Sequence, residues 1–263
     1  MIYKSLLVLF VSLSLSHAAN AQGVINLFPG DEIADGTVID SGTTVNVLGG
    51  SIGLGVDLAN GILNIESGDV AAGANSIGTG FTNSNNVVNL SGGEVGGFFQ
   101  LTNNTELNIS GGEIESFGLF GAGVVANISG GTVSRFPDIF SGGVVNISGG
   151  DIFAVRVFDG GEVNFTGTEF FIDGAPISLN VGQQLTIGQR NVNLSGFLAD
   201  GSFFETDLNT TFGGFGSANP DGAGANALVT ITGVAAVPEP GAATILMLAG
   251  SFLCVRRRSA TLC

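Results

Sequence analysis

The sequence predicts an all-β protein whose body is a parallel β-solenoid, a fold in which successive coils of the chain stack strand over strand. Three observations lead to this prediction. A short phrase recurs every 19 residues, apolar residues alternate within it, and 44 glycines in 263 residues divide the chain into short segments that disfavour helix. A disordered glycine-rich chain is the alternative, and the periodic Val, Ile, Leu and Phe argue against it.

Residues 1–21 are predicted to be a secretory signal peptide. Lys4 supplies the positive start, and residues 6–15 form an apolar stretch of the length that such signals use. Small residues then precede the expected cleavage point, which lies between Ala21 and Gln22, with Ala21 directly before the cut and Ala19 the third residue before it. The alternative is a buried N-terminal helix.

Residues 22–166 are predicted to form the solenoid. The phrase is Ψ-Asn-Ψ-Ser-Gly-Gly, where Ψ is apolar, and its asparagines are spaced by 19 residues at Asn89, Asn108, Asn127 and Asn146. Degenerate copies place Asn46, Asn64 and Asn164, and Asn26 marks a further copy at the start. Asn64 and Asn89 are 25 residues apart, so about six residues are inserted in the coil between them. We therefore expect up to eight coils, about 4.8 Å apart.

The columns of the repeat predict which side chains form the core. Counted from the residue before each Asn, positions 0, +2 and +7 are apolar and should point inward, since strand residues alternate between faces. Phe recurs at +10 and +13, where rings should stack from coil to coil. The asparagines themselves should form a hydrogen-bonded ladder. N-glycosylation of these Asn-Ψ-Ser/Thr sites is the weaker interpretation. Two or three strands per coil both remain open.

The composition excludes several classes of chemistry. Between Gln22 and Pro240 there is no His, Cys or Lys, so Ser-His-Asp and Cys-His catalysis and the usual zinc sites are excluded. That span holds three Arg against 22 Asp and Glu, a formal charge of −19, which disfavours nucleic acid as a partner.

One column of the repeat is acidic. It contains Asp69, Glu94, Glu113 and Asp151. A solvated acidic face is the favoured interpretation, and no cofactor is expected. Ca²⁺ bridging of these carboxylates is the weaker alternative, because no calcium-loop motif accompanies them.

Residues 167–234 lose the period but still contain strand-like segments. Asp-Gly pairs at 173–174 and 200–201 predict tight turns between strands, and residues 227–235 predict a last strand. We expect this region to cap the open end of the solenoid, with a small separate β-domain as the alternative.

The C-terminal residues 235–263 combine three features: Pro238-Glu239-Pro240, an apolar run over 241–255, and Arg256-Arg257-Arg258. We expect the run to form a transmembrane helix whose Arg cluster stays in the cytoplasm. The arrangement resembles the PEP-CTERM sorting signal of Gram-negative bacteria, including planctomycetes. The resemblance implies that an exosortase-type enzyme recognises the Pro-Glu-Pro motif and that the tail is removed as the protein reaches the cell surface or the extracellular matrix.

These observations favour an exported structural or adhesive protein of the cell surface or biofilm matrix, without enzymatic activity. It would meet signal peptidase, an exosortase-type enzyme, the inner membrane and exopolysaccharide. A polysaccharide-binding or polysaccharide-degrading β-helix is the alternative, and its only conceivable cluster joins Arg135 and Arg156 with Asp138, Asp151 or Asp159. Ice binding is less favoured, because the repeat carries Asn and Ser rather than rows of Thr.

Overall fold

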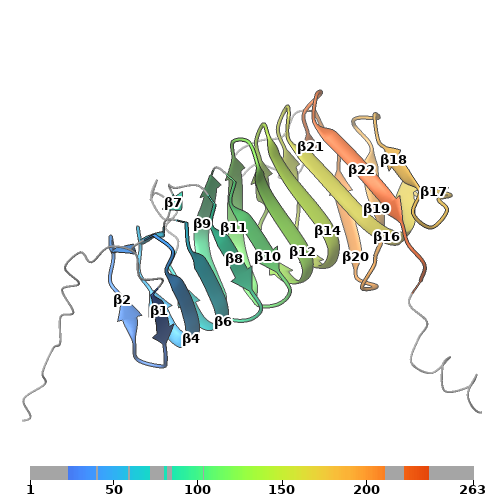
Figure 1. Cartoon of the computed structure of the whole chain (residues 1–263). Helices are drawn as coiled ribbons and strands as arrows, with labels where there is room; N and C mark the ends of the chain where they lie inside the picture. Colours follow the sequence, from blue (N-terminus) through green and yellow to red (C-terminus); the bar gives the residue numbers. More distant parts are fainter. Residues whose placement is uncertain are drawn as a thin grey trace, which may run out of the picture.

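A computed structural model of the chain confirms the all-β parallel solenoid (Figure 1). The structure describes residues 23–39, 41–58, 60–71, 80–81, 85–102, 104–210 and 222–236, and none of these is helical. Each complete coil contributes strands to three parallel ladders separated by corners, which settles the number of strands per coil at three.

The first ladder contains the Asn phrase and runs the length of the body. Each strand pairs in parallel with the next, and the Asn residues are paired with one another from Asn26 to Asn164, after which Thr230 lies opposite Asn164. The strands are β1 (Val24–Leu27), β4 (Thr44–Ile52), β6 (Ile62–Val70), β8 (Val87–Leu90), β10 (Glu106–Ile109), β12 (Val124–Val133), β14 (Gly143–Ile152), β16 (Glu162–Ile172) and β22 (Leu228–Gly233). The weak copy at Asn26 is therefore a true coil.

The second and third ladders are shorter. The second consists of β2 (Glu32–Ile33), the ends of β4, β6, β12 and β14, and the starts of β9 (Glu94–Thr102) and β11 (Glu113–Phe120). The third joins the ends of β9 and β11 with β7 (Gly80–Phe81), β13 (Pro137–Ile139), β15 (Arg156–Val157) and β21 (Gly222–Ala223). In the first coils β3 (Val38–Ile39) pairs with β5 (Asp57–Leu58).

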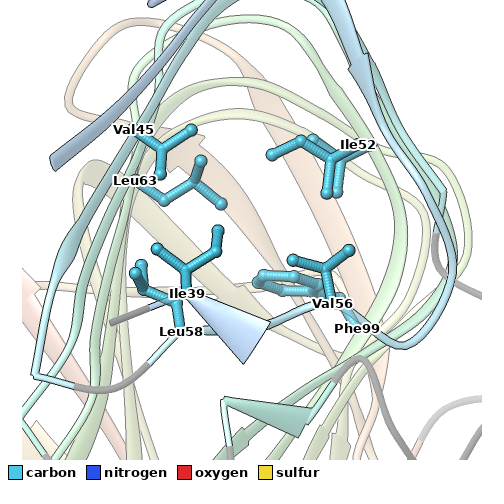
Figure 2. A pocket seen from close by; sticks show the side chains of 8 residues that line it. Ile39, Val45, Ile52, Val56, Leu58, Leu63 and Phe99 are labelled. Atoms are coloured by element: carbon cyan, nitrogen blue, oxygen red, sulfur yellow. The ribbon is translucent and has the colours of Figure 1, made fainter. Parts of the chain in front are cut away.

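The predicted core columns at positions 0, +2 and +7 are buried. The residues at 0 and +2 are at most 1% exposed, and they are Val88, Leu107, Ala126, Val145, Val163, Leu90, Ile109, Ile128, Ile147 and Phe165. The interior is packed so closely that the void among the first coils measures only about 10 Å³ (Figure 2). Its lining is entirely apolar, so a water molecule there would find no hydrogen-bond partner.

The expected column at +10 is wrong by one residue in two coils. Phe99 rather than Phe98 pairs with Phe117, and Pro137 rather than Phe136 pairs with Phe117 on the other side. The reason is that these two coils each have one residue more than the coil between them at the corner before the third ladder. A count along the sequence cannot detect where such an extra residue is absorbed.

The corners explain the glycines of the repeat. The second glycine of the phrase has a positive φ, for example +74° at Gly112, a conformation that side chains disfavour. A Cβ at Gly112 would also lie 2.8 Å from the backbone of the preceding coil. The corner before the first ladder has positive φ as well, and Gly or Asn occupies it, at Gly42, Asn60, Asn85, Asn104, Gly123, Gly142 and Gly160.

Antiparallel strands follow the last regular coil, as the sequence indicated. They are β17 (Ala175–Ile177), β18 (Gln184–Thr186), β19 (Asn193–Leu198) and β20 (Phe203–Asp207). Asp173 and Gly174, with φ of +48° and +75°, form the predicted tight turn between β16 and β17. β22 then returns as the last parallel strand of the first ladder, and β18 pairs with its other edge.

Asp200, in the turn between β19 and β20, fastens this region to the solenoid. Its carboxylate accepts hydrogen bonds from the backbone N–H of Gly150, at 2.8 Å, and from the N–H and hydroxyl of Ser202. Partial burial raises the pKa of the Asp200 carboxyl, but these hydrogen bonds outweigh it and hold the pKa below its usual value.

The predicted signal peptide and the predicted C-terminal helix lie outside the described residues. Within the described part of the chain, no segment forms a helix with the length and apolarity that crossing a membrane requires.

Candidate functional site

The asparagine ladder is the longest polar array in the described structure. Eight Asn side chains are joined by seven hydrogen bonds, and in each the Nδ2 of one coil donates to the Oδ1 of the preceding coil. The distances range from 2.7 Å, between Asn46 and Asn26, to 3.1 Å, between Asn108 and Asn89. The predicted ladder of asparagine hydrogen bonds is confirmed. These amide groups hydrogen-bond to one another and so hold neighbouring coils together.

The acidic column is also aligned from coil to coil. Asp69 pairs in register with Glu94, and Glu94 with Glu113, while Thr132 separates them from Asp151. All four carboxylates are exposed. Among the described residues no three His, Cys, Asp or Glu side chains lie close enough together to hold a metal ion. The column thus forms a negatively charged stripe along one corner.

Arg156 and Asp138 come together, but away from solvent. Arg156 Nε and Nη2 each lie 2.5 Å from a carboxylate oxygen of Asp138, and the two side chains are 3% and 6% exposed. The guanidinium also lies 3.6 Å from the centre of the Phe136 ring. Burial raises the pKa of the Asp138 carboxyl, and the hydrogen bonds and charge of Arg156 oppose that rise. A pair enclosed in this way joins β13 to β15 and offers no base to a substrate.

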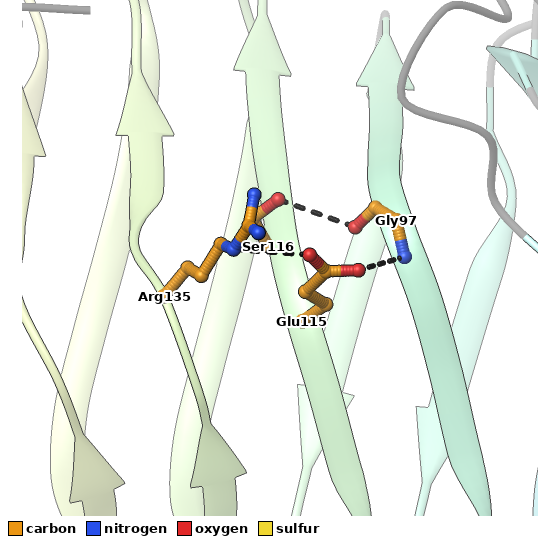
Figure 3. Close-up of polar contacts among 4 residues, drawn as sticks. All are labelled: Gly97, Glu115, Ser116 and Arg135. Atoms are coloured by element: carbon orange, nitrogen blue, oxygen red, sulfur yellow. Dashed lines mark hydrogen bonds and ion pairs between the residues drawn. The ribbon is translucent and has the colours of Figure 1, made fainter. Parts of the chain in front are cut away.

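Arg135 has a different partner, Glu115, which the sequence analysis did not single out. Figure 3 shows Glu115 between two neighbouring coils: its Oε1 lies 3.0 Å from Arg135 Nε, and its Oε2 accepts a hydrogen bond from the backbone N–H of Gly97 at 2.6 Å. Gly97 is one of two glycines that lie opposite Glu115 in the register. The carboxylate therefore accepts a backbone N–H at the point where the register of β9 and β11 shifts.

The other two acids of the postulated cluster lie elsewhere. Asp159 accepts a hydrogen bond from the backbone N–H of Asn226 at 2.9 Å, and Asp151 belongs to the exposed acidic column. The structure thus joins one Arg–Asp pair of the five residues and separates the rest.

Stacked phenylalanine rings line an open surface hollow of about 690 Å³. Phe140 lies between Phe120 and Phe158, with ring centres 4.3 and 4.4 Å apart and ring planes within 19° of each other. The stack at the expected +13 column is therefore built with Phe140, whereas Ile139 is buried in the core. Because the faces of Phe140 are covered by its neighbours, its ring presents an edge to the hollow, which is a poor platform for stacking a sugar.

The predicted sorting residues and cleavage residues, Pro238-Glu239-Pro240, Arg256-Arg257-Arg258, Ala19, Ala21 and Gln22, lie outside the described part of the chain. Comparison of the chain with protein families, with curated proteins and with solved structures finds no match.

Proposed function

We propose that the protein is an exported structural or adhesive component of the cell surface or extracellular matrix, sorted by its C-terminal Pro238-Glu239-Pro240 motif. Its partners during export are signal peptidase and an exosortase-type enzyme, and the segment over 241–255 holds it in the inner membrane until it is processed. The proposal rests on the succession of an apolar signal, a regular body and a tripartite tail in the sequence.

The body supports this proposal through what its polar groups do. The Asn ladder, the Asp138–Arg156 pair and the Glu115–Arg135 pair each join one coil to the next. Side chains used in this way stiffen a rod. A long rod with an acidic stripe suits a protein that extends from a surface or spaces polymers in a matrix.

The sorting step can be tested in a Gram-negative host that contains an exosortase. The full chain is compared with a variant in which Pro238, Glu239 and Pro240 are all replaced by alanine. We expect the natural chain in the surface or matrix fraction, shortened at its C-terminus, and the variant full-length in the inner membrane, as fractionation and intact-mass measurement will show.

Pro176→Ala serves as the matched control, because Pro176 is exposed in β17 and far along the chain from the motif. It should reach the same fraction as the natural chain. Surface delivery and shortening of the triple-alanine variant at the natural level would refute the role of the motif.

A further inference from the structure

The two ends of the solenoid differ in how their edge strands are paired. At the C-terminal end of the first ladder, β22 is paired on both edges, with β16 and with β18. At the N-terminal end, among the described residues, β1 and β2 pair only with β4 (Figure 1). In the same coils β3 pairs only with β5. An edge strand presents a row of backbone donors and acceptors that can pair with another strand.

The first coil also exposes apolar side chains. Val24, Phe28 and Val38 are 65%, 53% and 72% exposed, while Leu27 and Ile39 of the same coil contribute to the core. Pairing of another strand at this end would cover such side chains and continue the core of the solenoid.

The direction of the backbone groups of β1 follows from one hydrogen bond. The N–H of Thr44 in β4 donates to the carbonyl of Gly23 at 2.8 Å. Since the backbone groups of successive strand residues point to opposite edges, the N–H and C=O of Val24 and Asn26 are directed away from β4. These four groups form the open edge.

We propose that this edge binds the same edge of a second copy, so that two solenoids join N-terminal end to N-terminal end about a two-fold axis, with the two β1 strands antiparallel. The inference rests on the proposed cleavage before Gln22, which leaves one residue ahead of Gly23 and so no preceding segment of the same chain to cover β1. The opposite end of a second copy is an unsuitable partner, because β18 already occupies the edge of β22.

The charges near this end determine how the association of two copies should depend on salt concentration. Asp31, Glu32 and Asp35 are exposed in the first coil, and Arg135 is the first basic residue after Gln22. Two copies therefore bring acids toward acids, and salt screens that repulsion over a Debye length of about 8 Å at 0.15 M. The dimer should become tighter as the salt concentration rises, the opposite of an interface built on ion pairs.

Val24→Pro tests the edge selectively. Proline removes an N–H that points away from β4 and leaves the pairing of β1 with β4 in place. Val181→Pro is the matched control at the other end, because Val181 is 72% exposed. Val181 and Gly182 are the two central residues of a turn in which the Gln183 N–H donates to the Asn180 carbonyl, and Gly182 has a φ of +79°. Proline is favoured at the first central position of such a turn, which is the position of Val181.

The experiment uses protein recovered after export from a Gram-negative host, with its N-terminus read by mass spectrometry and its mass in solution by sedimentation equilibrium at low and high salt. We expect dimers that begin at Gln22 and tighten with salt. By symmetry Val24→Pro changes both copies, and it should weaken the dimer about tenfold or more, while Val181→Pro leaves it unchanged.

Protein that begins at Gln22 but stays monomeric, or whose dimer Val24→Pro leaves equally tight, would overturn the proposed interface without affecting export. Protein that retains residues 1–21 would instead refute the proposed processing and, with it, the basis of the dimer.

Discussion

Asn127→Ala should destabilise the protein at least twice as much as Asn26→Ala, although both residues belong to the same ladder. Asn127 donates to Asn108 Oδ1 and accepts from Asn146 Nδ2, both at 2.9 Å, and it also donates to Glu106 Oε1 at 3.2 Å. Asn26, at the end of the ladder, accepts from Asn46 Nδ2. With about 1 kcal/mol for each hydrogen bond, we expect losses of about 2 to 3 and about 1 kcal/mol in the free energy of unfolding.

The double variant of Asn108 and Asn127 sharpens this test. The two side chains share one hydrogen bond, so replacing both should cost about 1 kcal/mol less than the sum of the single replacements. Asn26 and Asn127 share none, and their replacements should add.

Urea unfolding followed by circular dichroism measures each value, with the slope of the transition compared among variants. Equal losses for Asn127→Ala and Asn26→Ala, or full additivity for Asn108 and Asn127, would show that the ladder does not hold the coils together.

Three further predictions concern the corners and the buried carboxylate. Gly112→Ala should cost about 2 kcal/mol or more in the same urea titration, whereas Gly96→Ala, where a new Cβ meets nothing within 4 Å, should cost about 1 kcal/mol or less. Asp138→Ala removes the carboxylate that pairs with the buried Arg156 guanidinium and should cost about 3 to 5 kcal/mol by thermal unfolding, most of which a further Arg156→Met change should restore. Asp200 has a lowered pKa, so its contribution is complete above the unfolded pKa of about 3.9 and is lost as the pH falls through the lower folded value; the stability difference from Asp200→Asn should vanish over that acid range.

The first ladder could be predicted from the sequence because its phrase keeps a strict period. The spacing of 19 residues between Asn89, Asn108 and Asn127 translates directly into their pairing in register. The third ladder could be predicted only in outline, since single extra residues before Phe99 and Pro137 shift the register. Such a residue changes the position of the side chains that follow it in the third ladder, and the chain absorbs it at a corner that the sequence does not mark.

The polar pairs show the same limit. Arg156 and Asp138 were candidates to meet, but their burial depends on the packing around β13 and β15 rather than on spacing. Glu115 was missed as the partner of Arg135, because a count along the sequence places Glu115 opposite Ser134, and the extra residue between Val133 and Pro137 brings Arg135 beside it instead. The two glycines in "EVGGFF", where the next coil has one residue fewer, mark the first of the two extra residues in the sequence.

The direction of the Asn ladder gives the rod an electrical polarity. All seven bonds point the same way, so the amide dipoles add, with hydrogens toward the Asn26 end and carbonyl oxygens toward Asn164. Reversing a single inner amide would place oxygen against oxygen and nitrogen against nitrogen, so the row has only two consistent states. Glu162 and Glu106 select one of them, because their carboxylates accept hydrogen bonds from Asn164 Nδ2 at 2.8 Å and from Asn127 Nδ2 at 3.2 Å and would repel the carbonyl oxygens of the reversed amides. Two carboxylates, one at the end and one inside the row, thus orient a row of side chains that extends through eight coils.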